Sequence, residues 1–571
     1  MTPSDDEPRG CLVPSPPFRG EREGTHRGAM GRVRWVAADA LESPTSPLPS
    51  PPPRAERVHV RKWIPSFAGM TLLTAVAACT VGPDYQRPAA PVPAAYKEAS
   101  ATPTAQPLAN WQVARPADAI DRGAWWSVYR DPALDGLERQ IDISNQNLKA
   151  AEAAFRQAEA IVAQARAGFF PTATINAQAQ RSRTSGGRVG TTGVSGGNTG
   201  RIGNLFSISA AASWVPDLWG KVSRTVEGNV ATAQADASDV ANARLAAQGQ
   251  LASDYMQLRV TDELKRLLDA AVAAYGESLR ITENQYNAGI AAASDVAQAR
   301  TQLESTQAQA IATGILRAQL EHAIAVLIGK PPADLTIAPV ASVPALPDIP
   351  AGLPSTLLER RPDIAAAERR MATANAQIGV AEAAFFPTVT LSADYGVSAA
   401  MIGTLFNTAS RMWSVGATIA QTVFDAGARH ALVEQDRALL DAAIADYRQV
   451  VLSGFQQVED ELAALRILAE QAAAEDIAVA SSREAERIIT NQYKAGTVAY
   501  TSVVVAQTTA LTNAQAALTV RQSRLVASVA LIEALGGGWD ASQVPSREQI
   551  ESDSPLNFNP LPPADAWPKL W

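Results

Sequence analysis

Two short stretches of this sequence alternate strictly between apolar and polar residues, and each begins after Phe-Phe-Pro-Thr. After Thr388 the odd positions read Val, Leu, Ala, Tyr and Val, while the even positions read Thr, Ser, Asp, Gly and Ser. After Thr172 the odd positions read Ala, Ile, Ala and Ala, while the even positions read Thr, Asn, Gln and Gln. A second alternating run follows each stretch, at 206–214 and 413–419. A period of two is typical of strands with one apolar face, so the sequence predicts two β-hairpins.

The simplest explanation for the alternation is that these strands are half-buried strands of a soluble sheet. Four strands are too few to build such a sheet, however, which favours a membrane location. The strands have the roughly 9–11 residues that a strand needs to cross a bilayer. Aromatic residues lie at the strand ends, where a membrane girdle would be: Phe169, Phe170, Phe385, Phe386 and Trp413. A sheet in lipid must close on itself, and the smallest single-chain barrels have about eight strands. We therefore expect several chains to share one barrel.

The beginning of the chain reads as a leader and an export signal. Residues 1–58 are rich in proline and have the composition of a disordered or non-native leader. Residues 59–78 contain a short basic stretch and an apolar run, as in a lipoprotein signal peptide. The run ends in Val76-Ala-Ala-Cys79, which resembles a lipobox and implies a diacylglycerol and an N-acyl chain on Cys79. A short buried helix with an incidental cysteine is the alternative. Thr80 follows the expected acylation site. By resemblance to bacterial lipoproteins, an Asp at this position would favour retention in the inner membrane, so the absence of Asp leads us to expect the outer membrane.

Composition excludes several classes of function. Removal of residues 1–78 leaves 39 basic and 49 acidic residues, which argues against nucleic acid as a partner. The histidines, at 26, 59, 322 and 430, lack metal-binding spacing, and no phosphate loop, paired-cysteine motif or nucleophile elbow is present. We therefore expect neither enzyme activity nor a cofactor, apart from the lipid on Cys79. No apolar run reaches the length of a membrane-spanning helix, so the strands are expected to cross the membrane.

The rest of the chain reads as long helices in a tandem repeat. A tether at 79–120 precedes repeat 1 at 121–338, a proline-rich linker at 339–354, repeat 2 at 355–535 and a tail at 536–571. Repeat 1 is predicted to contain helices, a β-hairpin at about 171–216 and a helical hairpin at 221–329; repeat 2 contains a helix, a β-hairpin at about 387–423 and a helical hairpin at 427–535. The turn Asn284-Gln-Tyr-Asn-Ala-Gly289 matches Asn491-Gln-Tyr-Lys-Ala-Gly496. The strands should therefore lie at one end of the long helices and these turns at the other.

This combination of motifs resembles the outer-membrane efflux proteins of the TolC/OprM type, in the NodT-like lipoprotein branch that serves RND-type pumps. The resemblance is carried by Cys79 with Val81-Gly-Pro-Asp-Tyr85, Trp125-Trp126, Glu359-Arg-Arg-Pro-Asp-Ile364, both Phe-Phe-Pro-Thr strands, Phe424-Asp-Ala-Gly427 and both Tyr-x-Ala-Gly turns. It implies a mainly α fold with a membrane β-barrel part, in which a homotrimer forms a 12-stranded barrel continuous with a long periplasmic α-helical barrel. It also implies a passive exit duct in the outer membrane, with a periplasmic adaptor and an inner-membrane RND-type pump as partners.

The resemblance also implies where the duct is gated. The adaptor would contact the turns at Tyr286, Ala288, Gly289, Tyr493, Ala495 and Gly496, although a simple helix stop explains these residues equally well. The gate would lie beside them, at Asp295, Val498, Ser502 and Val505. The family commonly places carboxylates after the second turn, but this sequence reads Tyr500-Thr-Ser-Val-Val-Val505. We therefore expect an apolar or hydroxyl-lined gate instead of an acidic ring.

Two other functions remain open at this point. One is an outer-membrane channel for a type I protein secretion system, which would share the duct. The other is a structural coiled-coil lipoprotein whose hairpins pack on protein instead of lipid, and which conducts nothing. The acylation site and the motif set favour efflux of drugs or other small toxic compounds.

Overall fold

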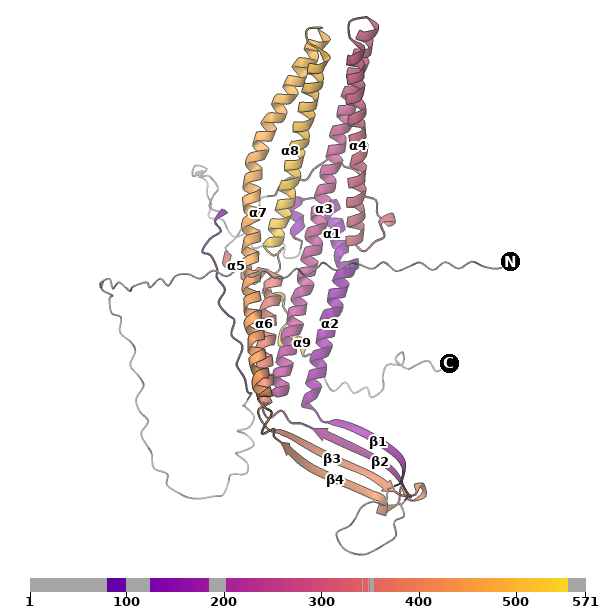
Figure 1. The fold of residues 1–571 in the computed structure, drawn as a ribbon, viewed down its shortest axis with the longest axis vertical. Helices are drawn as coiled ribbons and strands as arrows, with labels where there is room; N and C mark the ends of the chain where they lie inside the picture. Colours follow the sequence, from indigo (N-terminus) through magenta and orange to yellow (C-terminus); the bar gives the residue numbers. More distant parts are fainter. Residues whose placement is uncertain are drawn as a thin grey trace, which may run out of the picture. The chain divides into compact units, whose positions relative to one another are not determined.

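The structure of the protein, a computed structural model, describes residues 80–98, 124–183, 202–340, 342–347, 349 and 354–552 (Figure 1). The predicted leader, the signal peptide and the lipid anchor at Cys79 lie outside these residues.

The described chain contains nearly the same series of elements twice. Repeat 1 consists of η2 (Trp125–Tyr129), α1 (Pro132–Ser144), α2 (Gln146–Arg166), η3 (Ala167–Phe169), β1 (Thr172–Arg183), β2 (Ile202–Trp214), α3 (Lys221–Asn287), α4 (Ala293–Leu327) and η4 (Pro332–Asp334). Repeat 2 consists of α5 (Pro354–Arg360), α6 (Pro362–Ala383), β3 (Thr388–Ala399), η5 (Ile402–Thr404), η6 (Thr408–Ser410), β4 (Arg411–Ala420), α7 (Ala428–Lys494) and α8 (Tyr500–Ala534), followed by η7 (Ala541–Gln543) and α9 (Arg547–Ile550). Helices α3 and α7 have 67 residues each, and α4 and α8 have 35 each. The predicted duplication and mainly helical fold are confirmed.

The first α-helix, α1, is capped at its N-terminus by Asp131. Its carboxylate accepts hydrogen bonds from the backbone N–H groups of Ala133 at 2.9 Å and Leu134 at 3.4 Å, and Pro132 follows as the first helical residue. The other carboxylate oxygen accepts a 2.7 Å hydrogen bond from the Tyr255 hydroxyl on α3. One side chain therefore caps α1 and joins it to the long helix of the same repeat.

Helices α4 and α8 end at glycines that hold equivalent places in the two repeats. Gly329 and Gly536 have φ of +68° and +94°, a conformation that side chains rarely adopt. A Cβ on Gly329 would collide with the carbonyl of Ser144, and one on Gly536 with the carbonyl of Arg360. Each helical hairpin thus returns against the end of a short helix, α1 in one repeat and α5 in the other.

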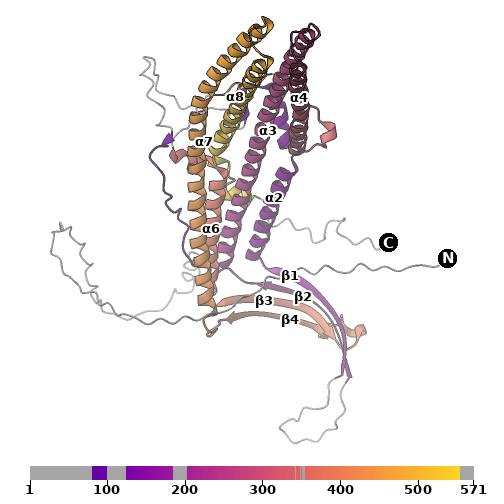
Figure 2. The same cartoon turned by 45° about the horizontal axis from the view of Figure 1, so that its top comes forward.

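Helix α3 is the common packing partner of both repeats. It packs against α2 and α6 toward the strands and against α4 and α8 toward the turns, while α7 packs on α6 and α8 (Figures 1 and 2). The main core lies where η2, α1, α3 and α8 meet, with Trp125, Tyr255 and Leu258 fully buried. The Tyr129 and Ser528 hydroxyls are 2.7 Å apart within it. Because Ser528 belongs to α8, this core joins the two repeats.

The segment from residue 80 to residue 98 is extended, as expected of a tether, but it packs along the helices. The Tyr85 hydroxyl donates to Glu368 Oε1 at 2.7 Å, and Arg87 Nη2 donates to the Tyr447 hydroxyl at 3.2 Å. Burial and the neighbouring Glu368 raise the pKa of Tyr85, so it stays protonated and donates at physiological pH. The Arg224 guanidinium, almost fully buried, donates to the backbone carbonyls of Val81 and Gly82. The segment is therefore held by α3, α6 and α7.

Helix α4 departs from one expectation drawn from the sequence. By length and composition alone it is long and apolar enough to cross a membrane, whereas no apolar run was expected to reach that length. Isoleucine, leucine, valine and alanine together make the helix apolar on average, but polar residues such as Arg317, Glu321 and His322 interrupt them, so no long uninterrupted apolar run is present. One such helix is weak grounds for a membrane span, and α4 packs along α3 beside the turns.

The four strands form one antiparallel sheet in the order β1-β2-β3-β4, at the end of the helices away from the turns (Figure 2). Its register aligns the apolar positions of all four strands. Ile175, Ala210, Tyr395 and Trp413 are opposite one another, and so are Ala173, Ala212, Ala393 and Val415. The neighbouring rows are mostly polar or small, such as Thr174, Ala211, Asp394 and Ser414. The sheet has the two faces that the sequence predicts.

A pair of adjacent substitutions tests this facing. Leu391→Arg places a charge in the apolar row between Trp214 and Ala417, where lipid contact makes it cost about 2–4 kcal/mol near the bilayer midplane. Thr390→Arg, on the opposite face beside Thr418, should cost much less. The amount of folded protein extracted from the outer membrane measures the difference. Equal yields of the two variants would contradict the facing.

Candidate functional site

The long helices end, opposite the sheet, in two turns of the same geometry. Gly289 and Gly496 both have φ of +74°, the left-handed conformation in which many helices end. Gly289 N–H donates to Tyr286 O and Gly496 N–H donates to Tyr493 O, both at 2.9 Å. A Cβ on either glycine would meet no described protein atom within 4 Å. Both turns therefore end a helix and also present an open backbone surface.

The two tyrosines of these turns have different environments. Tyr286 is 49% exposed, whereas Tyr493 is 7% exposed. The Tyr493 hydroxyl donates to Thr282 Oγ1 at 3.2 Å, and its ring packs edge-on against Tyr500 with centroids 5.2 Å apart. Of the six residues predicted to contact an adaptor, five are exposed, and only Tyr493 is buried between the helical hairpins.

Further buried hydrogen bonds connect the two hairpins beneath Tyr493. The Tyr275 hydroxyl of α3 donates to the Gln507 backbone carbonyl of α8 at 3.1 Å, and Gln507 Nε2 donates to Ser278 Oγ at 3.1 Å. Burial raises the pKa of Tyr500 to about 12, with Tyr493 and Tyr275 adding to the shift. Each buried hydrogen bond contributes about 1 kcal/mol, and an orphaned partner costs more. We call Tyr275, Ser278, Thr282, Tyr493 and Gln507 the seam network.

The four predicted gate residues lie at or near the starts of α4 and α8. Asp295 lies in the first turn of α4, where its carboxylate accepts from Ala292 N–H at 3.3 Å. Its charge helps to raise the pKa of Tyr493, behind the larger effect of burial, so the structure brings it close to the second turn. Val498 packs against the apolar cluster that contains Tyr493. Ser502 is half-buried and Val505 is mostly exposed.

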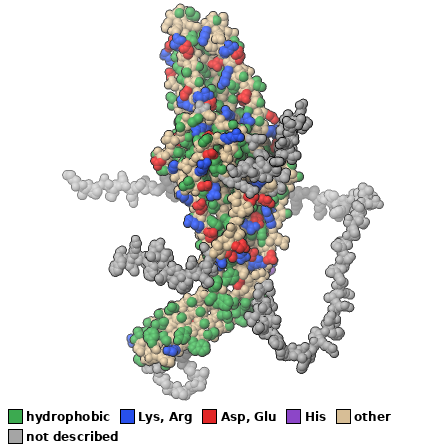
Figure 3. All heavy atoms as spheres, turned by 180° about the vertical axis from the view of Figure 1, so that it is seen from behind, with side chains coloured by type: hydrophobic (Ala, Val, Ile, Leu, Met, Phe, Trp, Pro, Cys, Tyr) green, Lys and Arg blue, Asp and Glu red, His purple; other side chains and the backbone are tan. Residues whose placement is uncertain are grey.

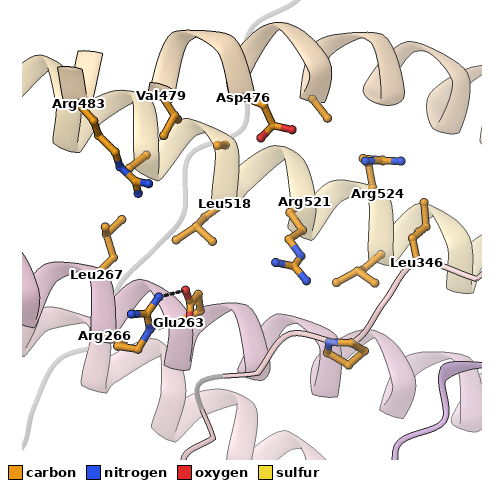
Figure 4. A pocket seen from close by; sticks show the side chains of 15 residues that line it. Glu263, Arg266, Leu267, Leu346, Asp476, Val479, Arg483, Leu518, Arg521 and Arg524 are labelled. Carbon is orange, nitrogen blue, oxygen red and sulfur yellow. Dashed lines mark hydrogen bonds and ion pairs between the residues drawn. The ribbon is translucent and has the colours of Figure 1, made fainter. Parts of the chain in front are cut away.

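Nearer the middle of the helices, a cavity of about 480 Å³ interrupts the packing between the hairpins (Figure 4). Its charged lining consists of Glu263, Arg266, Asp476, Arg483, Arg521 and Arg524. Arg266 Nε donates to Glu263 Oε2 at 2.9 Å, and this contact lowers the pKa of Glu263. Arg521 donates to the Val343 carbonyl of the linker at 3.0 Å. Below the seam network, a cavity with a largely charged lining therefore lies between α3 and the α7–α8 hairpin.

Aromatic residues gather where the sheet meets the helices. Phe170, Phe385 and Phe386 are partly exposed there, and Trp219 stacks on Phe386 with ring centroids 5.0 Å apart. Trp219 Nε1 donates to Pro387 O at 2.7 Å, and Trp214 Nε1 donates to Phe169 O at 3.0 Å. Trp413, the fifth predicted girdle residue, lies near the other end of its strand, opposite Tyr395.

No group of three or more His, Cys, Asp or Glu side chains that could hold a metal ion occurs among the residues whose structure is described. The described residues present a four-stranded sheet at one end of the helices and two open turns at the other. The comparison with known proteins identifies the family to which this arrangement belongs. The family model described as outer membrane efflux protein matches residues 138–330 and 353–537. This chain belongs to the outer membrane efflux protein family.

The matches between this efflux protein and individual relatives extend over nearly the whole length of each relative. The solvent efflux pump outer membrane protein SrpC of Pseudomonas putida is 32% identical over 488 residues, which are 84% of this chain and 99% of SrpC. A probable efflux pump outer membrane protein of Pseudomonas putida, TtgC, is 30% identical over 478 residues, 84% of this chain and 96% of TtgC. The solved outer-membrane channel OprN superposes with a TM-score of 0.72 at 29% identity, over 81% of this chain and all of OprN. The predicted fold class, outer-membrane location and efflux function are confirmed.

Sequence reasoning missed most of the seam network of this efflux protein. The hydroxyl of Tyr275 donates to a carbonyl of α8 that is 232 residues away in the sequence, so no local pattern indicates this contact. One signal in the sequence could have indicated the roles of Thr282 and Gln507, because both are polar residues on helix faces that are rich in apolar residues. Trp219 could have been assigned to the girdle, because tryptophan is enriched at membrane interfaces.

The seam network predicts unequal effects at the two equivalent tyrosines. Tyr493→Phe removes the hydrogen bond to Thr282 and should weaken the closed seam by about 1 kcal/mol, so the open fraction of single channels should rise roughly fivefold. Tyr286→Phe is the matched control, because its hydroxyl has no hydrogen bond within the described part of the chain. Recording of single channels in planar bilayers measures both variants. An equal open fraction for Tyr493→Phe and the unmodified protein would contradict a closing role for this bond.

Proposed function

We propose that three copies of this chain form the exit duct of a tripartite efflux system. The duct passively conducts drugs or other small toxic compounds from an inner-membrane RND-type pump and a periplasmic adaptor across the periplasm and the outer membrane. No chemical step is involved, so the structure has to provide a sealed wall, a wet lumen and a gate.

The observation that carries this proposal is the four-stranded sheet with one apolar face. Its outer strands, β1 and β4, each have a neighbour on one side only within the described chain. Unpaired backbone groups are too costly in lipid, and four strands cannot close on themselves. Three copies supply twelve strands, which closes the barrel with β1 of one copy beside β4 of the next. The hydrophobic side chains over the strands contrast with the mixed charges of the helices (Figure 3).

The helices support the same closure. The outermost helices of a protomer expose large apolar residues along their free sides. On α4 these include Ile311, Ile315 and Val326, and on α7 they include Ile467 and Ile477. Two different apolar edges on one chain suit a head-to-tail ring, in which α7 of one copy covers α4 or α2 of the next. Such a ring also accounts for the apolar face of α4 without a helical membrane span.

The lumen would be lined by the polar rows of the sheet and, further down, by the inner pair of helices. We assign α7 and α8 as the inner pair, held against α3 by the seam network. Opening would move α7 and α8 outward and break those hydrogen bonds. Val505 and Ser502 would then line the aperture, which makes it apolar and hydroxyl-lined, with no acid from the second turn.

The position of the N-terminal segment supports a lipid anchor at Cys79. Val81 N–H donates to the Trp219 carbonyl at 3.3 Å. Gly220 lies directly against Thr80, so that a Cβ added to Gly220 would meet atoms of Thr80. Residue 80 therefore sits at the aromatic end of the sheet, where the membrane surface facing the helices would be. An acyl chain on the preceding cysteine could enter that leaflet directly.

The two open turns support an adaptor contact. Gly289 and Gly496 leave room for a close approach of another backbone, and Ala288 and Ala495 beside them are exposed. SrpC is named for solvent efflux, which supports small toxic compounds as the cargo of this chain.

Ion conduction tests the proposed duct. The purified full chain, reconstituted in planar bilayers, should give discrete conductance steps, larger or more frequent in Tyr493→Phe. A membrane-inserted protein that passes no current, even with this substitution, would favour a structural lipoprotein instead. In cells, deletion of the gene should sensitise growth to toxic organic compounds; loss of a secreted protein with unchanged sensitivity would indicate a type I secretion channel.

The lipid anchor has its own test. Cys79→Ala should abolish metabolic fatty-acid labelling, while heat-resistant trimers persist on a gel because the barrel holds them in the membrane. Cys11→Ala, at the other cysteine of the sequence, is the matched control and should keep the label. Labelling that survives Cys79→Ala would refute the anchor.

A further inference from the structure

The loop ends of the strands carry a charge bias that passive conduction does not require. Three arginines lie in the strands, Arg181, Arg183 and Arg411, and the sequence between β1 and β2 adds Arg188 and Arg201. Residues 172–214 contain no Asp or Glu, and 388–420 contain one, Asp394. The whole chain has a formal charge of −8. Positive charge is therefore concentrated at the end of the sheet farthest from the helices.

The register shows which face these arginines occupy. Arg411 is opposite Val397, in the row that continues through Ile208 to Ala177. Arg181 and Arg183 share a face of β1 with Ile175, because alternate residues of a strand point the same way. All three strand arginines thus belong to the apolar, lipid-facing side of the sheet. In the space-filling view, basic atoms on the sheet appear at its end away from the helices (Figure 3).

These arginines are available to a ligand. All three are exposed, and none of their guanidinium groups has a hydrogen bond or ion pair with another described residue. The segment between β3 and β4 adds apolar groups at the same end, since Met401, Ile402 and Phe406 are each more than half exposed. A surface that combines unpaired guanidinium groups with exposed apolar side chains fits an amphiphile that carries anionic groups and acyl chains.

We propose that Arg181, Arg183 and Arg411 bind the phosphates of a bisphosphorylated glycolipid in the outer leaflet of the outer membrane. The inference rests on the proposed trimer, because barrel closure brings β1 of one copy beside β4 of the next. Arg411 of one copy then lies at the strand edge that neighbours Arg181 and Arg183 of another. The helices extend into the periplasm, so these strand ends face the outer leaflet. Guanidinium groups bind phosphate oxygens in bidentate fashion, and two phosphates suit arginines contributed by two strands.

The test measures lipid binding by the purified trimer in detergent, using native mass spectrometry. Bisphosphorylated lipid A should bind most tightly, with monophosphorylated lipid A and phosphatidylglycerol weaker. Near an anionic lipid surface each arginine contributes roughly a fivefold gain in affinity. The triple variant Arg181→Gln, Arg183→Gln and Arg411→Gln should therefore bind bisphosphorylated lipid A roughly 100-fold more weakly, with a smaller dependence on salt.

A matched control removes the same charge from the helices. Arg280→Gln, Arg300→Gln and Arg487→Gln affect exposed ion pairs, and they should leave lipid binding unchanged. Both triple variants must first give conducting, heat-resistant trimers, and failure of the unmodified protein at this step would count against the duct itself. If conducting trimers of the unmodified protein and of the strand variant bind bisphosphorylated lipid A equally, the glycolipid site is wrong while the duct stands. Equal binding of phosphatidylglycerol and bisphosphorylated lipid A by the unmodified trimer would also overturn it.

Discussion

Backbone hydrogen bonding in lipid is the constraint on which the rest of this structure depends. A strand that crosses a bilayer must pair on both sides, because no water is available to satisfy its N–H and C=O groups. This chain provides four paired strands and leaves one side each of β1 and β4 without a neighbour in the described sheet. The apolar rows on one face mean that the sheet cannot simply remain in water. Assembly with other copies is therefore required by the chemistry of the sheet.

In the proposed duct the helices meet a different requirement, since they would have to seal a wall and still move. Near the strands, α3 is packed by α2 and α6, and the segment at 80–98 adds contacts across α6 and α7. Toward the turns, the two hairpins meet through a few buried hydrogen bonds around Tyr493, next to a charged cavity. In the proposed duct, firm packing near the strands and sparser packing between the hairpins near the turns would place the movable part at the periplasmic end. The exposed glycine turns would then lie where an adaptor could act on those helices.

Much of this arrangement could be predicted from the sequence because it follows from local periodicity. The two-residue period identified the strands and their faces, and Gly289 and Gly496 identified the turns. The bonds between hairpins could not be predicted, since Tyr275 and Gln507, or Thr282 and Tyr493, are more than 200 residues apart. Equivalent positions in a repeat also misled: Tyr286 and Tyr493 share a motif, yet one is exposed and the other buried. The local sequence determines the conformation of each turn, whereas packing against the neighbouring hairpin determines which of the two tyrosines is buried.

Disulfide cross-linking between the outer strands tests the central claim most directly. Single cysteines placed along β1, from Ala173 to Ala179, would be combined in one chain with single cysteines along β4, from Trp413 to Ile419. Oxidation in intact outer membranes should produce covalent dimers and trimers for at least one register. Pairs between β1 and β3 should not cross-link, because β2 separates these strands. Covalent trimers are the predicted result; monomers at every register, in protein that is folded and membrane-inserted, would contradict a barrel shared between copies.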